Sequence, residues 1–281
     1  MWGFVRGSDA LKTMMLAFAI GLASPALAEA PTRVVSMNLC TDQLALMLAA
    51  PGQLVSVSFL AHDGAVAALS DAARALPANR GLVEEIYLLQ PDLVLAGPYS
   101  TGATVAMLAR LGVPVARFAL ENSLDDVETS LTRMGAVLGR EAQAAAAIAQ
   151  FRTDRTALAA RAALREPQRA ALYSARGWTG GTVSLASDIL RAAGLQNIAA
   201  ELGLDWGGQI ALEALIMANP DRLVLGEQTR GYSEAQALLD HPALRSMRAY
   251  GAGVTTSGPD WVCGTPFVLR AVARLLDQEG S

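Results

Sequence analysis

Two stretches of the chain follow the same plan, and this duplication limits the possible folds more than any other feature of the sequence. The first runs from Glu84 to Gly97 (EEIYLLQPDLVLAG) and the second from Glu213 to Glu227 (EALIMANPDRLVLGE). Each opens with a glutamate on a short helical pattern, reaches Pro-Asp seven residues later and continues as an apolar run. Such a run is typical of a strand buried on both faces. The sequence therefore predicts two similar halves.

Strand and helix patterns alternate in the same order on both sides of these stretches, which indicates mostly parallel sheets flanked by helices. We expect strands at residues 33–37, 53–58, 92–97 and 113–119, and again at 169–175, 222–227 and 252–257. We expect helices at 42–50, 65–76, 83–89, 104–112 and 123–139, and again at 185–194, 211–218, 233–247 and 267–278, with residues 38–41 as a loop. Ser123 has the side chain and position of a helix N-cap.

One longer helix separates the two halves. Residues 141–166 contain no glycine or proline, are rich in alanine and end before Pro167. A helix of this length spans roughly 35 to 40 Å, and Ile148, Phe151 and Leu158 give it an apolar stripe. We predict an N-terminal α/β lobe at 29–140, a backbone helix at 141–166 and a C-terminal α/β lobe at 167–281, with a ligand cleft between the lobes.

The first 28 residues have the pattern of a secretory signal peptide, with an uncleaved N-terminal anchor as the alternative. Arg6 and Lys12 precede an apolar run that ends in a small-residue cleavage pattern at Ala28. Cys40 lies too far from this run to be lipid-modified, so we expect a soluble periplasmic protein without a lipid anchor. The formal net charge of −4 and the lack of a contiguous basic segment argue against nucleic-acid binding.

Aromatic residues gather in the loops that are expected to face the cleft. Aromatic residues make up only 5% of the chain, yet every tryptophan after the signal segment lies in a Gly- or Pro-rich loop. This distribution favours a ligand surface, with packed loop anchors as the alternative for each side chain. The predicted ligand-binding residues are Asn38, Cys40, Tyr99, Arg176, Trp178, Trp206, Tyr232, Trp261 and Cys263.

Metal ligands are scarce, and the cysteines permit several interpretations. The chain has only two histidines, His62 and His241, in surroundings typical of a turn and of a helix break, so a bare zinc or manganese site is not expected. No resident cofactor is expected either. Cys40 and Cys263 form a disulfide, remain separate buried thiols or contact a ligand or metal, and the sequence does not choose between these alternatives.

The order of motifs resembles the periplasmic substrate-binding proteins of ABC importers for cobalamin, haem and iron-siderophore complexes. The resemblance is carried by RVVSMN, EEIYLLQPDLVLAG, LARLGVPV, SLDDVETSLTRMGAVLGREA, DILRAAGLQNIAAE and LEALIMANPDRLVL. It implies two lobes joined by one long helix, a metal-chelate ligand in the cleft and no enzymatic activity. It also implies delivery to an ABC permease dimer with cytoplasmic ATPases by a receptor that is monomeric when free.

In that family one glutamate on each lobe, seven residues before the Pro of the Pro-Asp motif, docks into arginine pockets of the permease. The spacing selects Glu84 and Glu213 here, with Glu85 as the local competitor of Glu84. Trp206 lies close to where cobalamin-binding relatives carry a ligand-contacting tryptophan. A corrinoid or ferric siderophore is the expected ligand. Haem remains an alternative because Tyr99, Tyr173 or Tyr232 offers an axial ligand.

Two other classes of function remain open. An exported α/β enzyme would use the same cleft, although the chain contains no Walker loop, no dinucleotide-binding glycine pattern and no Gly-x-Ser-x-Gly motif. A sensor of the same fold would bind a ligand without delivering it. The sensor would not depend on Glu84 and Glu213 for uptake, whereas a transport receptor would.

Overall fold

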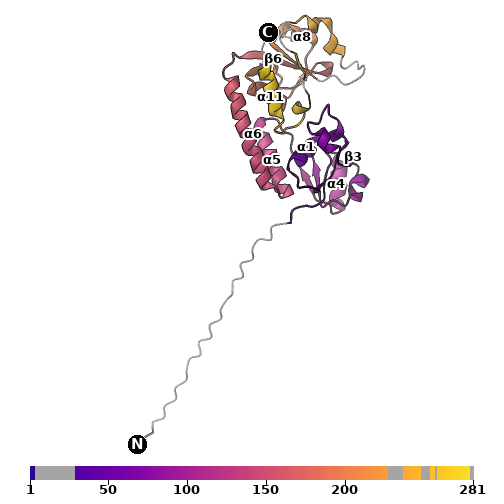
Figure 1. Ribbon diagram of the computed structural model, residues 1–281, viewed down its shortest axis with the longest axis vertical. Helices are drawn as coiled ribbons and strands as arrows, with labels where there is room; N and C mark the ends of the chain where they lie inside the picture. The colour runs from indigo at the N-terminus through magenta and orange to yellow at the C-terminus, as the bar shows by residue number, and fades with distance from the viewer. Residues whose placement is uncertain (4–28, 227–236, 248–253, 257, 279–281) are drawn as a thin grey trace.

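Two parallel sheets, one in each half of the chain, organise the fold. The computed structural model describes residues 1–3, 29–226, 237–247, 254–256 and 258–278. Figure 1 shows two α/β lobes lying one above the other, with the long helix along one side. Most of the expected signal segment and Tyr232 lie outside the described residues.

Four strands of the first sheet have the same order and connections as the four strands of the second, which confirms the duplication predicted from the sequence. The first sheet has the order β3-β2-β1-β4-β5, and the second has the order β11-β10-β6-β8. All the strand pairs in both sheets are parallel. Position by position, β2-β1-β4-β5 corresponds to β8-β6-β10-β11. The strands are β1 Val34–Ser36, β2 Leu54–Ser58, β3 Ala78–Asn79, β4 Leu93–Ala96, β5 Val115–Arg117, β6 Gln168–Tyr173, β8 Leu195–Asn197, β10 Arg222–Leu225 and β11 Val254–Thr256.

Helices follow the strands in both lobes. The first lobe has α1 Leu39–Leu48, η1 Phe59–His62, α2 Ser70–Ala73, α3 Val83–Leu88, α4 Gly102–Arg110 and α5 Leu124–Leu138. The second has η2 Ala175–Gly177, α7 Leu185–Ala192, η3 Ile198–Ala200, α8 Leu212–Ala218, η4 Ala237–Asp240, α9 Pro242–Arg245, η5 Pro259–Trp261 and α11 Val268–Asp277. It also has an antiparallel pair formed by β7 Trp178–Thr179 and β9 Gly208–Gln209. Ser123 caps α5 as predicted, in a reciprocal pair with Asp126.

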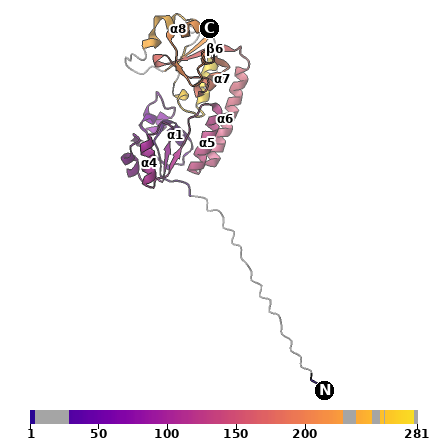
Figure 2. The same cartoon turned by 180° about the vertical axis from the view of Figure 1, so that it is seen from behind.

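The backbone helix α6 covers Glu141–Ala162, four residues fewer than predicted. Its 22 residues span about 33 Å. Phe151 is buried, and Ile148 and Leu158 pack against the core at its edge, which confirms the predicted stripe. Figures 1 and 2 both show α6 alongside α5 and reaching from one lobe to the other. We propose the boundaries 29–140, 141–166 and 167–281 as the units of the fold.

Three predicted elements differ in the structure. Residues 65–76 were expected as one helix, but only α2 is helical there, because Leu69 N–H donates to the Gln43 side chain (2.8 Å) instead of continuing a helical ladder. The expected loop at 38–41 is the first turn of α1, capped by Asn38. The segment expected as a helix at 233–247 contains η4 and α9, separated at His241, whose Nδ1 accepts from Ala243 N–H (3.2 Å).

One hydrophobic core runs through both lobes. It includes Val34 and Leu44 from the first lobe, Phe151 of α6, and Leu172 and Leu276 from the second, all buried. A smaller cluster packs under α8, and another packs under α3 and α4. Because the main core is shared, the lobes are held by packing as well as by their covalent connections.

Candidate functional site

The Pro-Asp motif of the first lobe ties the end of α3 to the start of the central strand. Asp92 accepts hydrogen bonds from the backbone N–H groups of Thr32 (2.7 Å) and Arg33 (2.9 Å). The Arg33 guanidinium in turn donates to the carbonyl of Leu89 (2.7 Å), beyond the last turn of α3. Gln90 bridges helix and proline with a positive φ of 49°. These contacts fix the position of the end of α3 relative to the start of β1.

The second lobe repeats this corner with equivalent residues. Asp221 accepts from the backbone N–H of Arg169 (3.0 Å), and the Arg169 guanidinium donates to the carbonyl of Asn219 (3.2 Å). Asn219 takes the same left-handed conformation as its counterpart, with a φ of 43°. The repeated Pro-Asp is thus a structural device that positions one short helix on each lobe. Each of these helices carries exposed side chains, including its first-turn glutamate.

Glu84 and Glu213 occupy the second positions of α3 and α8, and both side chains are exposed. A carboxylate in the first turn is favoured by the helix dipole. Glu85, the competitor of Glu84, accepts a hydrogen bond from the backbone N–H of Arg80 (2.7 Å) and is half-buried. The structure therefore leaves Glu84 as the freer acid, and docking through Glu84 and Glu213 stays a prediction.

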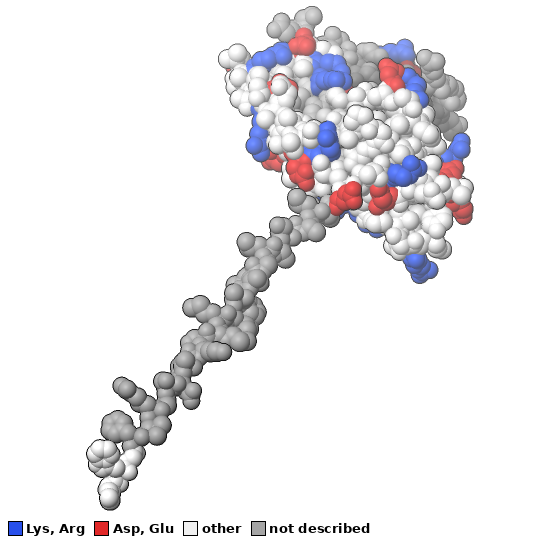
Figure 3. Space-filling view, turned by 60° about the horizontal axis from the view of Figure 1, so that its bottom comes forward, with Lys and Arg blue, Asp and Glu red and all other residues white. Residues whose placement is uncertain are grey.

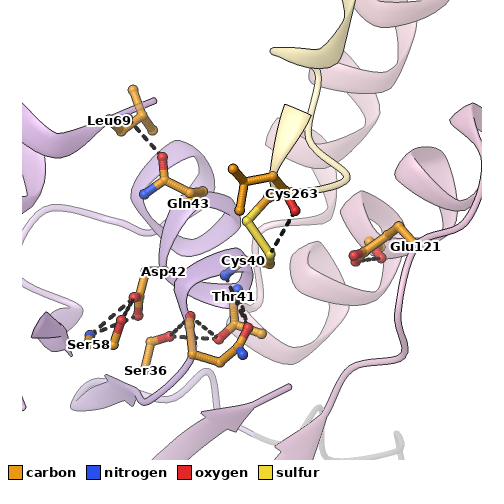
Figure 4. The surroundings of a disulfide bond; sticks show 12 residues. Ser36, Cys40, Thr41, Asp42, Gln43, Ser58, Leu69, Glu121 and Cys263 are labelled. Carbon is orange, nitrogen blue, oxygen red and sulfur yellow. Dashed lines mark hydrogen bonds between the residues drawn. A yellow bond between two sulfur atoms is a disulfide. The ribbon is translucent and has the colours of Figure 1, made fainter. Parts of the chain in front are cut away.

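A disulfide joins the two lobes where the carboxyl ends of their strands meet. Cys40 lies in the first turn of α1, directly after β1, and Cys263 lies after β11, with the two Cα atoms 5.1 Å apart (Figure 4). Loops that follow parallel strands lie at the carboxyl edge of a sheet, where small molecules bind in α/β folds. The carboxyl edges of the two sheets therefore face each other at this seam.

The disulfide settles the cysteine alternatives, because neither sulfur is a free thiol available to a metal or ligand. The surrounding seam is tightly packed: a Cβ on Gly264 would stand 2.3 Å from Cβ of Glu121. Trp261 belongs to the same core cluster, with 8% of its surface exposed. Its indole is therefore buried, which corresponds to the alternative of a packed loop anchor, and ligand binding by Trp261 stays an untested prediction.

A buried acid lies beside the seam. Asp42 of α1 is fully buried and accepts from the backbone N–H (3.1 Å) and the hydroxyl of Ser58, as Figure 4 shows. Burial raises the pKa of Asp42 from 3.8 to about 6, although the hydrogen bonds from Ser58 oppose this shift. The folded protein therefore holds the proton of Asp42 more tightly than the unfolded chain does.

This shift predicts a pH dependence of stability. As the pH rises from 4 to 7, Asp42 loses its proton at a lower pH in the unfolded chain than in the folded protein. The stability that the raised pKa contributes at low pH is therefore lost as the pH rises through about 6. A shift of about two units corresponds to about 3 kcal/mol. We expect the free energy of unfolding of the wild type, relative to Asp42→Asn, to fall by about this amount in urea titrations from pH 4 to pH 7. A difference that stays constant with pH would contradict this expectation.

Trp178 begins β7, and Trp206 lies two residues before β9, the strand with which β7 pairs. Trp178 pairs with Gln209, and the loop carrying Trp206 is held against Gly181, where a Cβ would stand 2.2 Å from the backbone nitrogen of Gly207. Both indoles are exposed, Trp206 to 78%. This segment follows the carboxyl end of β6, the edge of a parallel sheet where small molecules bind in α/β folds.

The other predicted ligand-binding residues divide by exposure. Tyr99, in the loop after β4, and Arg176, which has a φ of 57° in η2, are exposed and available to a ligand. Asn38 is committed to capping α1, since its Oδ1 accepts from the N–H groups of Cys40 (3.1 Å) and Thr41 (3.4 Å). Tyr173 is fully buried, and burial together with the charge of Glu213 raises the pKa of its hydroxyl. Tyr173 is therefore not placed to reach an axial position on a ligand.

Sequence reasoning missed two exposed apolar side chains at the carboxyl edge of the first sheet. Phe59 and Leu60 begin η1, immediately after the carboxyl end of β2, and both are exposed. The signal was present, since a phenylalanine directly follows a predicted strand at 53–58. His62 of the same turn bonds through Nε2 to the Leu76 carbonyl (3.1 Å) and serves the local structure.

The described residues set further limits on the site. A cavity of about 480 Å³ lies between α6, α7 and α11, and its lining contains none of the predicted ligand-binding residues. Within the described residues, no group of three or more His, Cys, Asp and Glu side chains is placed to hold a metal ion. No helix in this part of the chain has the length and apolar character needed to cross a membrane. On the face shown in Figure 3, acidic and basic residues are interspersed.

Comparisons with known proteins place the chain among periplasmic binding proteins. A family model described as periplasmic binding protein matches residues 34–254. A cobalamin-binding protein of Halobacterium salinarum is 28% identical over 228 residues, which cover 79% of this chain. The match spans 62% of the length of that curated relative.

Two solved structures show the same fold at low sequence identity. The periplasmic haem-binding protein RhuT of Roseiflexus sp. RS-1 has a TM-score of 0.74 and 22% identity, and the match covers 88% of this chain and 97% of RhuT. The periplasmic vitamin B12-binding protein BtuF of Vibrio cholerae has a TM-score of 0.67 and 20% identity, covering 88% of this chain and 96% of BtuF. Both confirm the expected two-lobed α/β architecture.

Proposed function

The chain belongs to the periplasmic binding protein family, and we propose that it captures a metal-chelate ligand between its lobes and delivers it to an ABC permease. The observation that carries this proposal is the meeting of the carboxyl edges of two equivalent sheets at the Cys40–Cys263 seam. Residues after parallel strands at such an edge are suited to enclosing one small molecule from two sides.

A large, partly planar ligand fits the exposed residues at these edges. Trp178 and Trp206 from the second lobe and Tyr99 from the first offer aromatic faces, which bury much area at little cost in side-chain entropy. Arg176 adds a cation for a carboxylate or phosphate of the ligand. We propose a corrinoid or a ferric siderophore, in keeping with the cobalamin-binding relative. Haem is the alternative, supported by the fold of RhuT and by the exposed Tyr99.

Delivery is proposed to depend on Glu84 and Glu213, one on each lobe, docking on an ABC permease dimer that is driven by cytoplasmic ATPases. The two exposed acids on equivalent helices suit a partner with two-fold symmetry. We propose that the protein is a free monomer in the periplasm after cleavage near Ala28, without a lipid anchor and without enzymatic activity. An exported enzyme would convert its ligand, whereas this receptor releases it unchanged.

Equilibrium binding to three chelates tests the proposal and its aromatic site together. Aquocobalamin, ferrichrome and haemin are titrated separately, with intrinsic tryptophan fluorescence and calorimetry as readouts. We expect one of them to bind at 1:1 stoichiometry, and Trp206→Ala to weaken that binding by about 30-fold, the equivalent of about 2 kcal/mol. Met107→Ala, which removes an exposed apolar side chain from α4, serves as the matched control and keeps the wild-type affinity.

Three outcomes would count against the proposal or a part of it. If none of the three chelates binds, the ligand class is wrong. If the bound molecule is recovered chemically altered, the enzyme alternative replaces the receptor. If Trp206→Ala and Met107→Ala lose equal affinity for the chelate, the proposed role of Trp206 in binding is wrong, while the receptor function still stands.

A further inference from the structure

The two glutamate-bearing helices share a second feature beyond their acids. Tyr87 and Leu88 follow Glu84 by three and four residues, and Ile216 and Met217 follow Glu213 at the same spacing. All four apolar side chains are exposed. Leu88 is 81% exposed and Met217 is 85% exposed, so they are among the most exposed large apolar side chains in the described part of the chain.

The four exposed apolar side chains are not the ones that anchor the two helices to the lobes. Ile86 in α3 and Leu215 in α8, again at equivalent positions, are fully buried and fasten each helix to its lobe. Residues four apart lie on one helix face, so Leu88 stands on the face of Glu84, and Met217 stands on the face of Glu213. Single exposed apolar residues are ordinary on protein surfaces. Here, however, an exposed apolar pair occurs at the same spacing from an exposed glutamate on both lobes. We call each such set of a glutamate and two apolar side chains a footprint.

We propose that each lobe docks on the permease through a composite footprint, in which Leu88 or Met217 enters an apolar pocket beside the group that receives the glutamate. The inference rests on the proposed delivery to a permease and specifies the chemistry of that partner. Each half of the permease dimer presents a cation next to an apolar depression. The acid steers and orients the encounter, while burial of the apolar side chain holds the complex.

The two parts of the footprint respond differently to salt. Attraction between exposed charges is screened at high ionic strength, whereas burial of apolar surface is not weakened by screening. A complex held by acids alone would dissociate at about 0.5 M salt, where the Debye length falls to a few ångströms. A composite footprint retains measurable binding under the same conditions, and this residual binding depends on Leu88 and Met217.

The test measures binding of the purified receptor to the permease–ATPase complex of the same organism, reconstituted in nanodiscs, at about 0.05 M and 0.5 M salt. We expect Leu88→Ser with Met217→Ser to weaken binding by about 100-fold, about tenfold for each side chain, at both salt concentrations. Glu84→Gln with Glu213→Gln weakens binding mainly at low salt. Leu164→Ser, at a side chain 88% exposed beyond the end of α6, is the matched control and leaves binding unchanged.

The outcomes separate this inference from the proposed function. Loss of binding in the glutamate variant together with wild-type affinity in Leu88→Ser/Met217→Ser overturns the composite footprint and leaves delivery standing. Failure of the wild-type receptor to bind the complex overturns both. Circular dichroism and unchanged chelate binding verify that the variants fold, as expected for substitutions at exposed positions.

Discussion

Replacing Cys40 and Cys263 together by serine is expected to lower the free energy of unfolding by about 4 to 5 kcal/mol. The disulfide connects residues 223 positions apart, so it closes nearly the whole folded chain into one loop. In the chain-entropy account, a crosslink stabilises mainly by restricting the unfolded state, and the effect grows slowly with loop length. The seam is also buried on the Cys263 side, so a serine hydroxyl there adds a desolvation cost.

Chemical unfolding in guanidinium chloride at fixed pH measures this loss. Reduction of the wild type is the control that changes no side chain other than the cysteines, and it should give a similar loss. Reductant added to the double serine variant should change nothing. A double variant within about 1 kcal/mol of the wild type would mean that the shared core alone holds the lobes.

The disulfide also bears on ligand capture. Because it crosses the seam between the two carboxyl edges, it restrains how far the lobes separate there, together with the common core and α6. We interpret the receptor as one that admits its ligand through small rearrangements, since a continuous helical connector and a crosslink both resist hinge bending.

The duplicated architecture was predictable because it rests on local patterns. Buried parallel strands leave unbroken apolar runs, and one such strand in each half, β4 or β10, is preceded by a glutamate-led helix and a Pro-Asp pair. The helix prediction failed where tertiary contacts replaced local ones. Residues 65–76 have helical composition, but the N–H of Leu69 bonds to Gln43, 26 positions away. The hydrogen-bond pattern of a helix is therefore interrupted by a partner that lies outside the local segment from which the helix was predicted.

The site was predictable in part. The position of Trp206 in an exposed loop follows from its Gly-rich surroundings, and the structure places it there. Trp261 has similar Gly- and Pro-rich neighbours, yet it is buried, because its loop is enclosed at the seam between the lobes. Burial at an interface of two lobes depends on their docking, which no local pattern encodes. The pairing of Cys40 with Cys263 depends on the same docking.

The second large effect is expected from reversing charge at Glu84 and Glu213. Both carboxylates are exposed at the starts of helices that the Pro-Asp corners hold in equivalent positions. In the proposed docking, an arginine at each site would meet cations of the permease with like charge, and like charges at an interface cost several kcal/mol. The proposed ligand-binding residues do not include either glutamate, so Glu84→Arg with Glu213→Arg should bind the chelate as the wild type does.

A matched control keeps the change in net charge the same. Asp71→Arg with Glu166→Arg reverses two exposed acids that do not belong to α3 or α8. Asp71 forms only a surface ion pair with Arg74, whose loss is worth little. This control separates the effect of position from the effect of added positive charge on the whole receptor.

Uptake of the radiolabelled chelate by cells that carry each variant tests the central claim most directly. The account predicts that Glu84→Arg/Glu213→Arg lowers uptake by at least 100-fold, the equivalent of about 3 kcal/mol, while the purified variant keeps its chelate affinity and the control variant transports normally. Wild-type uptake in the Glu84→Arg/Glu213→Arg strain would contradict the account and leave a binding protein or sensor that does not deliver its ligand through these helices.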